Sequence, residues 1–592
     1  MRVADYVIEE LCKKGVKHIF TVTGRGTLYL TDAVAKQPEL EVICTHHEQA
    51  AAFAAMSYAQ YNDNLGACLV STGVGATNAI TALLCVWQDS VPCIFISGQN
   101  LLNETTRHTK TPIRTYGQQE ADIVKLVESI TKYAIMIEKP CNIAYEVEKA
   151  LHLAQEGRKG PVWIDIPVDV QNMRVEPDEL NHFRPDIVNP PTLSDDIIFI
   201  LQSLTESKRP AILIGSGIRS ANVIDEFNDF VEKYNFPVAY THSAADTFGT
   251  RNELSIGAVG SMGGTRAGNF VVQNSDLLLV LGSSLSTFTT GSEYHKFARD
   301  AKIIVVDIDE KEHTKNTVNV DKFIHLNLNS FFEEMKLVNL QAASKGWLHK
   351  CLHWKKLFTK CEDQFKSTDK VNLYDFTESL SEVLPDICTV LTDAGLQELI
   401  IPPNLSLKSG QRCIHPSAQG SMGYALPASV GAHYSGSENV IAVIGDGSIM
   451  MNLQELETIA YNNIPVKIIV ISNNVYTVIR DRQKDLFRKR TIGTDPSNGV
   501  SCPDFQKVAK CFGIKYMKIK DASNLKQDLS TLINEQGPIL CEVMGDENQK
   551  YIHNSYTIGK NRKFVRRTLE DQSPFLDRDL FLSEMIIEPI DQ

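Results

Sequence analysis

The segment from Gly445 to Asn474 most constrains how this chain of 592 residues can fold. It opens with the turn Gly445-Asp446-Gly447-Ser448, which follows the apolar run 440–444, and it closes with Asn473 and Asn474 after a second apolar run, 467–472. Between the two runs, leucine and isoleucine recur at the spacing of one helix face. The sequence therefore predicts a strand, a glycine turn, a helix and a second parallel strand.

The residue types in this turn suit an anionic ligand and a metal ion. Glycines let the backbone approach a bulky anion, and the start of a helix offers unpaired N–H groups to a diphosphate. The carboxylate of Asp446 and the amide oxygen of Asn473 return to the same sheet edge, because neighbouring parallel strands end together. Such hard oxygen donors favour Mg²⁺ or Ca²⁺. The alternative is an ordinary turn in which Asp446 caps the following helix.

Gly-Asp-Gly followed at this distance by Asn-Asn resembles the binding motif of thiamine diphosphate (ThDP)-dependent enzymes, and nearly the whole chain resembles their acetolactate synthase group. The resemblance implies that Mg²⁺ is bound by Asp446, Asn473 and the carbonyl oxygen of Val475. It implies that Gly447 and Ser448 hold the diphosphate. Further residues that it assigns to the cofactor site are Gly24, Asn78, Gln99, Gly445, Val475 and Tyr476.

Alternating helical and strand patterns predict an α/β fold with three doubly wound parallel sheets, which is the fold of ThDP enzymes. We expect a pyrimidine-binding domain at 1–180, a central domain at 190–340 and a diphosphate-binding domain at 371–545, followed by an extension at 546–592. The lysine-rich stretch 336–370 is interpreted as a helical linker.

Composition excludes several classes of protein. The net charge of −13 argues against nucleic-acid binding, and no apolar run reaches the roughly 18 residues that a membrane helix needs. The first residues are acidic where a signal peptide is basic and then apolar. The 13 cysteines include no Cys-x-x-Cys pair, which favours reduced thiols and a cytoplasmic location.

Glu48 is the candidate catalytic acid. It follows a predicted strand and opens an alanine-rich helix, 50–59, so it lies at the rim of the first sheet. The resemblance assigns Glu48 to N1′ of the cofactor's aminopyrimidine, where a dry site raises the pKa of a carboxyl and lets it donate a proton. The alternative is a first-turn acid that is favoured by the helix dipole.

Other motifs match the family in part. The turn 73–78 has Val74 where the family has proline, and Gln118 replaces the phenylalanine that precedes the family's catalytic glutamine, here Gln119. Met422 matches the apolar residue that bends the cofactor and brings its reacting groups together. A core methionine is the alternative.

The resemblance implies an FAD, without a redox role, in the central domain. Matching positions are 215–217, 263–265 and 307–309, whereas 284–289 departs from the family pattern. Isolated glycine turns are weak evidence for a nucleotide.

The implied reaction is decarboxylation of a 2-oxo acid, with pyruvate favoured, followed by transfer of the two-carbon unit to a second carbonyl. Arg482 stands where the biosynthetic acetolactate synthases have tryptophan, and with Arg480 it predicts a basic loop. Such a loop suits an anionic acceptor or one that carries phosphates, and a solvated basic run is the alternative. The stretch 563–577 resembles the ending of ThDP lyases from bacterial surface-polysaccharide pathways, which implies a nucleotide-linked keto-sugar as the alternative acceptor. A simple 2-oxo acid decarboxylase is a further alternative. The family assembles as homodimers or homotetramers, with active sites between subunits.

Overall fold

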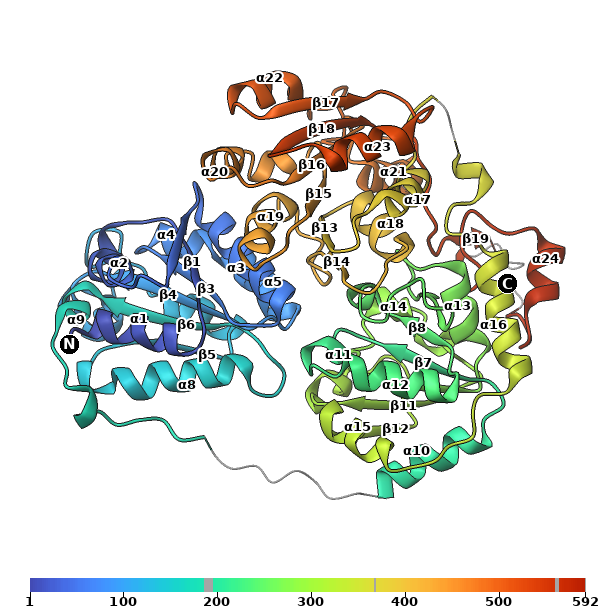
Figure 1. The fold of residues 1–592 in the computed structure, drawn as a ribbon, viewed down its shortest axis with the longest axis horizontal. Coiled ribbons are helices and arrows are strands. Elements are labelled where there is room, and N and C mark those ends of the chain that lie inside the picture. The colour runs from blue at the N-terminus through green and yellow to red at the C-terminus, as the bar shows by residue number, and fades with distance from the viewer. Residues whose placement is uncertain (186–194, 367–368, 559–563, 591–592) are drawn as a thin grey trace.

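The computed structural model describes residues 1–185, 195–366, 369–558 and 564–590. They form three units, each built on a six-stranded parallel sheet (Figure 1). The strand orders are β2-β1-β3-β4-β6-β5, β12-β11-β10-β7-β8-β9 and β14-β13-β15-β16-β18-β17. The predicted α/β fold with three parallel sheets is confirmed.

The strands of each sheet fall within one of the ranges expected for the three domains, whose bounds stay a prediction. The first sheet contains β1 (His18–Thr21), β2 (Glu41–Cys44), β3 (Gly66–Val70), β4 (Cys93–Gln99), β5 (Tyr133–Met136) and β6 (Val162–Pro167). The second contains β7 (Pro210–Ile214), β8 (Val238–Tyr240), β9 (Ser255–Ala258), β10 (Leu277–Leu281), β11 (Lys302–Asp307) and β12 (Lys322–His325). The third contains β13 (Cys388–Thr392), β14 (Gln411–Ile414), β15 (Val440–Gly445), β16 (Lys467–Ser472), β17 (Lys515–Ile519) and β18 (Ile539–Met544).

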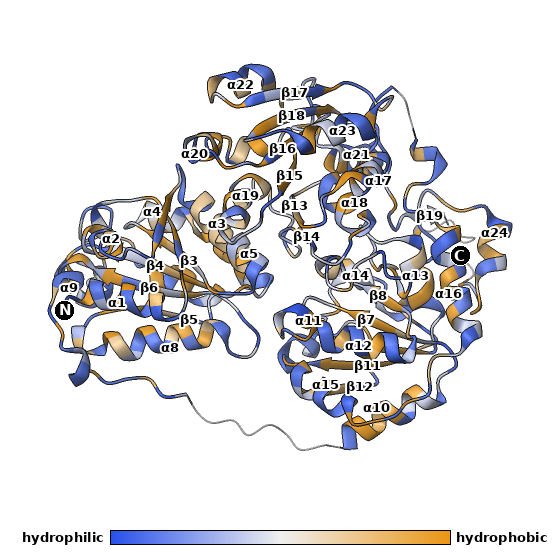
Figure 2. Ribbon diagram, viewed as in Figure 1, coloured by the Kyte–Doolittle hydropathy of each residue, from blue (hydrophilic) through white to orange (hydrophobic). Residues whose placement is uncertain are grey.

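Helices cover both faces of each sheet, and Figure 2 shows the apolar strands enclosed between them. Strands that are buried on both faces need near-continuous apolar runs, which β10 and β15 have. The helices used below are α3 (Glu48–Asn62), α4 (Val74–Asn78), α5 (Ile80–Gln88), α16 (Lys345–Leu357), α19 (Ala425–Tyr434), α21 (Thr477–Leu486) and α24 (Arg578–Glu584). Within the described ranges, no helix is long and apolar enough to cross a membrane.

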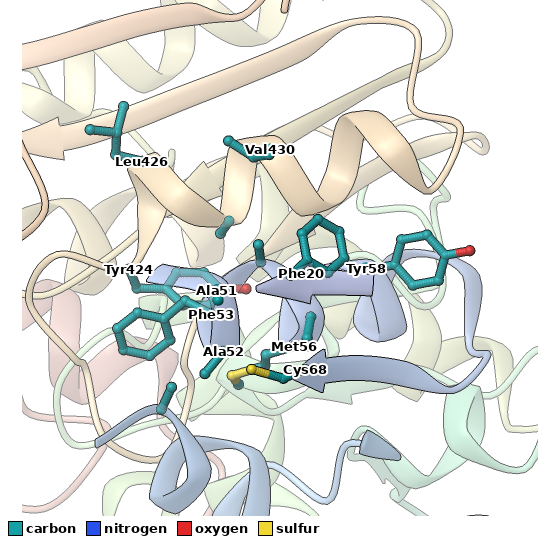
Figure 3. Packing of buried hydrophobic residues seen from close by; sticks show 14 of the residues in the cluster. Phe20, Ala51, Ala52, Phe53, Met56, Tyr58, Cys68, Tyr424, Leu426 and Val430 are labelled. Carbon is teal, nitrogen blue, oxygen red and sulfur yellow. The ribbon is translucent and has the colours of Figure 1, made fainter. Parts of the chain in front are cut away.

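Helices α3 and α19 join the first and third units into one apolar core (Figure 3). Phe53 of α3 packs edge-on against Tyr424, with ring centroids 5.4 Å apart. A Cβ on Gly431 would lie 2.0 Å from the carbonyl oxygen of Ala54. Because α3 is rich in alanine and α19 has glycine at the contact, the two backbones approach closely.

The stretch predicted as a helical linker does contain a helix, α16, but this helix packs into the core of the central unit. The helix buries Trp347 and Trp354 completely or nearly so. The Trp354 indole donates a hydrogen bond to Glu584 of α24 at 2.9 Å. Helix α24 thus packs on the central unit through α16, and Figure 1 shows the two helices side by side.

The contact between α3 and α19 gives a stability prediction. Gly431→Ala should lower the free energy of unfolding by about 2 kcal/mol, because the added methyl group forces the helices apart. Gly346→Ala, in α16 with no atom near the added Cβ, is the matched control and should leave stability unchanged or slightly higher. Thermal unfolding of both variants checks this, and equal midpoints would contradict the packing argument.

Candidate active site

The Gly-Asp-Gly turn lies where β15 ends, beside the end of its parallel neighbour β16. The carboxylate of Asp446 joins the two strand ends. Its Oδ2 accepts hydrogen bonds from the N–H groups of Asn473 at 2.9 Å and Asn474 at 2.5 Å, and its Oδ1 accepts one from Gly447 at 2.8 Å. The residues proposed as metal ligands, Asp446 and Asn473, therefore lie together.

The available donors fit Mg²⁺. Burial raises the pKa of Asp446, and across the described part of the chain no ion pair neutralises its carboxylate, so a cation would be stabilised there. The Asn473 Oδ1 accepts a hydrogen bond from the Val475 N–H at 3.2 Å and has a second lone pair for a metal. No cluster of three His, Cys, Asp or Glu side chains suited to a metal occurs among the described residues. A metal here would be held by oxygens.

Both glycines of the turn lie close to side chains, and Gly447 is required by its neighbour. A Cβ on Gly447 would lie 2.1 Å from the ring of Tyr476, which immediately precedes α21. A Cβ on Gly445 would lie 3.1 Å from the side-chain amide of Gln397. The structure thus places two further predicted cofactor residues, Tyr476 and Gly445, around the turn.

Ser448 links the turn to the segment that carries Met422. Its hydroxyl donates to Asp393 Oδ2 at 2.7 Å and accepts from the Gly423 N–H at 2.8 Å. Asp393 follows β13, and burial raises its pKa to about 7. Because the Ser448 hydroxyl is used in this way, its predicted contact with a phosphate would come from its backbone N–H. Asp393 is not among the residues predicted from the sequence.

Glu48 begins α3 at the edge of the first sheet. Its Oε2 accepts a hydrogen bond from the side-chain amide of Asn78 at 2.9 Å. A Cβ on Gly75 would lie 3.2 Å from Glu48 Oε1. The structure therefore brings together two of the predicted cofactor residues, Glu48 and Asn78, and only a small residue fits beside the carboxylate.

The remaining predicted residues of the first sheet lie near the same edge but differ in accessibility. A Cβ on Gly24 would lie 2.3 Å from Ser71 Oγ. Gln119 is exposed and has a left-handed backbone, with φ of 63°. Gln99 is 2% exposed, and its amide donates to Ala121 at 2.9 Å and Asp165 at 3.1 Å. Gln99 would have to give up these bonds to contact a cofactor.

The edges of the first and third sheets meet beside the turn. Asn452 donates to the side chain of Gln49 at 3.0 Å and to the Gly423 carbonyl at 2.8 Å. The carboxylate of Glu48 itself points to Asn78, and in the described ranges no hydrogen bond joins it to residues 445–474. One chain thus supplies both edges, but Glu48 does not reach the turn.

Comparison with known proteins identifies the family. Three models of thiamine pyrophosphate enzymes match the chain: the N-terminal TPP-binding domain at residues 1–126, the central domain at 197–334 and the C-terminal TPP-binding domain at 393–543. The chain belongs to the thiamine pyrophosphate enzyme family. Thiamine pyrophosphate is another name for ThDP, so the predicted family and a ThDP-dependent enzyme are confirmed.

Curated relatives of this ThDP enzyme cover nearly its whole length. The acetolactate synthase large subunit of Cyanidium caldarium is 30% identical over 566 residues, which span 92% of this chain and 93% of that protein. A probable acetolactate synthase large subunit of Methanocaldococcus jannaschii is 32% identical over 568 residues, 92% of each chain. The predicted resemblance to the acetolactate synthase group is therefore confirmed.

A cavity of about 440 Å³ lies between the three units of the enzyme. Its walls include Gly215, Gly217, Phe288 and His415. Cβ atoms on Gly215 and Gly217 would strike the backbone of Gly282, so close packing of the chain explains these glycines without a nucleotide. His415 is 4% exposed, and neither of its ring nitrogens has a hydrogen-bond partner among the described residues.

The prediction of a basic loop is wrong, because Arg480 and Arg482 lie on helix α21, and Arg480 is not a free cation. This side chain is 8% exposed, and its guanidinium donates to the Glu547 carbonyl and, at 3.3 Å, to Asn548. Arg480 therefore anchors α21 to the segment after β18. Arg482 remains exposed.

Asp89 gives a pH prediction. Its Oδ1 accepts from Ser417 at 2.7 Å and Ala418 at 3.0 Å across two units, and burial raises its pKa to about 6. Since the folded pKa lies above the unfolded one, ionisation of Asp89 costs stability between pH 4 and 6. Asp89→Asn should therefore gain up to about 3 kcal/mol over the wild type as pH rises through this window, and the gain should level off above it.

Denaturant unfolding at a series of pH values measures this gain. Asp178→Asn is the control, because Asp178 is exposed and its replacement should leave the pH dependence unchanged. A constant difference between Asp89→Asn and the wild type from pH 4 to 7 would contradict the role given to burial.

Proposed function

We propose that this enzyme decarboxylates a 2-oxo acid, with pyruvate favoured, and transfers the two-carbon unit to a second carbonyl compound. The observation that carries the proposal is the pairing of Asp446 with Asn473 at the ends of β15 and β16. Relatives named acetolactate synthases that align over the full length support carboligation.

The residues have distinct proposed roles. Asp446, Asn473 and the Val475 carbonyl would hold Mg²⁺, and Gly447 and the Ser448 N–H would meet the diphosphate, since backbone N–H groups near a helix start favour anions. ThDP, when bound, stabilises negative charge at the carbon that loses CO₂.

The proposed acid–base group is Glu48, which would hold and release a proton at the cofactor's N1′ nitrogen. The hydrogen bond that the Asn78 side-chain amide donates to Glu48 fixes the carboxylate in one orientation, as general acid–base chemistry requires. Met422 would support the bent cofactor. The Ser448 hydroxyl holds the segment that carries Met422, because it accepts a hydrogen bond from the Gly423 N–H. Gln119, exposed on the same edge, would face the substrate.

FAD is proposed for the cavity between the three units. The cavity has a volume typical of organic ligand sites, and the unpartnered nitrogens of His415 offer a ligand a donor and an acceptor. Asp307 and Ile308, which the resemblance assigns to this site, line the cavity. No redox step is proposed.

Assembly into a homodimer or homotetramer would complete the active site. Apolar side chains are exposed near both edges, with Val74 at 67%, Met450 at 43% and Met451 at 51%. Exposed apolar side chains beside a functional edge favour an interface. We propose that Glu48 of one subunit serves the turn of another.

A nucleotide-linked keto-sugar is the alternative acceptor. It is favoured by Arg482, which is exposed on α21. This helix begins directly after Tyr476, and the Tyr476 ring lies against Gly447. A simple decarboxylase, in which the two-carbon unit leaves as an aldehyde, is the other alternative.

The proposal is tested by the products of purified enzyme given ThDP, Mg²⁺ and labelled pyruvate, alone and with a nucleotide keto-sugar, as measured by mass spectrometry. Acetolactate from pyruvate alone is the expected result. Product only with the sugar would establish the alternative acceptor. Free acetaldehyde without any carbon–carbon bond formation would refute carboligation.

A further inference from the structure

The loop after β1 presents one arginine at the edge that carries Glu48. Arg25 is exposed, whereas the glycines on both sides of it are pressed against the two residues that follow β3. A Cβ on Gly24 would lie 2.3 Å from Ser71 Oγ, and one on Gly26 would lie 2.0 Å from Thr72 Oγ1. The backbone is therefore held on the sheet while the side chain of Arg25 extends from it.

A second residue orients the guanidinium. Arg25 Nη1 donates to Gln118 Oε1 at 3.0 Å, and the Gln118 carbonyl accepts from the side-chain amide of Asn100 at 2.9 Å. The adjacent carbonyl, that of Gln119, lies against Gly73. Gln118 is the position where this chain departs from the family's phenylalanine, and the structure gives its amide a partner in Arg25.

Contacts along the sheet edge connect Arg25 to Glu48. Ser71 Oγ accepts a hydrogen bond from the Gly26 N–H at 3.3 Å. A Cβ on Gly75 would lie 3.3 Å from Ser71 Cβ and 3.2 Å from Glu48 Oε1. The arginine and the proposed acid thus belong to one edge, separated by small residues.

The charge of Arg25 is not neutralised within the described ranges, where no ion pair involves it. Arg107 of the same unit, by contrast, pairs with Asp122 at 3.1 Å. Gln118 is uncharged and occupies one nitrogen of the guanidinium, which leaves further N–H donors for a ligand. A planar guanidinium matches the geometry of a carboxylate or a phosphate.

We propose that Arg25, oriented by Gln118, recognises the anionic group of the acceptor, either the carboxylate of a 2-oxo acid or a phosphate of a nucleotide-linked sugar. This inference rests on the proposed carboligation. It assigns acceptor specificity to the first unit, and not to Arg480, which is buried.

The test compares an anionic and a neutral acceptor. Wild type and Arg25→Gln receive ThDP, Mg²⁺ and labelled pyruvate, and acetolactate is measured against acetoin formed with added acetaldehyde. Arg25→Gln should lower kcat/KM for acetolactate about 10- to 100-fold, as expected for loss of a charged hydrogen bond, and should leave acetoin formation unchanged. Arg25→Lys should recover part of the loss.

Binding of UDP, which has phosphates but neither a carboxylate nor a sugar keto group that could accept the two-carbon unit, distinguishes the two anions without turnover. If calorimetry shows that Arg25→Gln weakens UDP binding at least about 10-fold, the anion that Arg25 recognises is a phosphate. A loss confined to acetolactate formation assigns a carboxylate.

Two variants are controls. Lys17→Gln removes an exposed charge at the opposite end of β1 and should change neither acceptor. Arg482→Gln tests the exposed arginine of α21. Equal effects of Arg25→Gln on both acceptors, or no effect on either anion, would overturn the proposal. Wild-type enzyme that forms no carbon–carbon bond even with acetaldehyde would instead refute the carboligation on which the proposal rests.

Discussion

The carboxylate of Asp446 is the interaction on which the arrangement of the site depends. It accepts backbone N–H groups from its own turn and from the segment after β16, so two strand ends that lie 27 residues apart in sequence are joined at one point. A carboxylate taken out of water needs such donors or a cation. The same group thus fixes the turn and creates a place for a metal.

The sequence predicts this part of the structure well because its contacts lie within one strand–helix–strand unit and the turn that follows it. Glycine at 447 is required by the Tyr476 ring, and parallel strands bring Asp446 to Asn473. Asp393 was missed because its partner, Ser448, is 55 residues away. A signal did exist, since Asp393 follows a strand and precedes Gly395, much as Asp446 lies in its own turn.

Two other predictions were wrong because they used the charge of a segment, and the sequence does not show whether its side chains are buried. The lysine-rich stretch around Trp354 looks solvated in sequence, yet its tryptophans fill the core of the central unit. Arg480 looked like a free cation, but its partners are Glu547 and Asn548, which a pattern within α21 cannot reveal. Arg25 was overlooked because an isolated arginine between glycines has no periodicity, and its pairing with Gln118 depends on the fold.

The most direct test of the central claim is exchange of the thiazolium C2 proton of ThDP for deuterium, followed by NMR with wild-type enzyme and Glu48→Gln in the presence of Mg²⁺. The account predicts that Glu48→Gln still binds ThDP, because Asp446 and the turn are intact, while exchange slows at least about 100-fold. Exchange at the wild-type rate in Glu48→Gln would contradict the assignment of the catalytic acid to the edge of the first sheet.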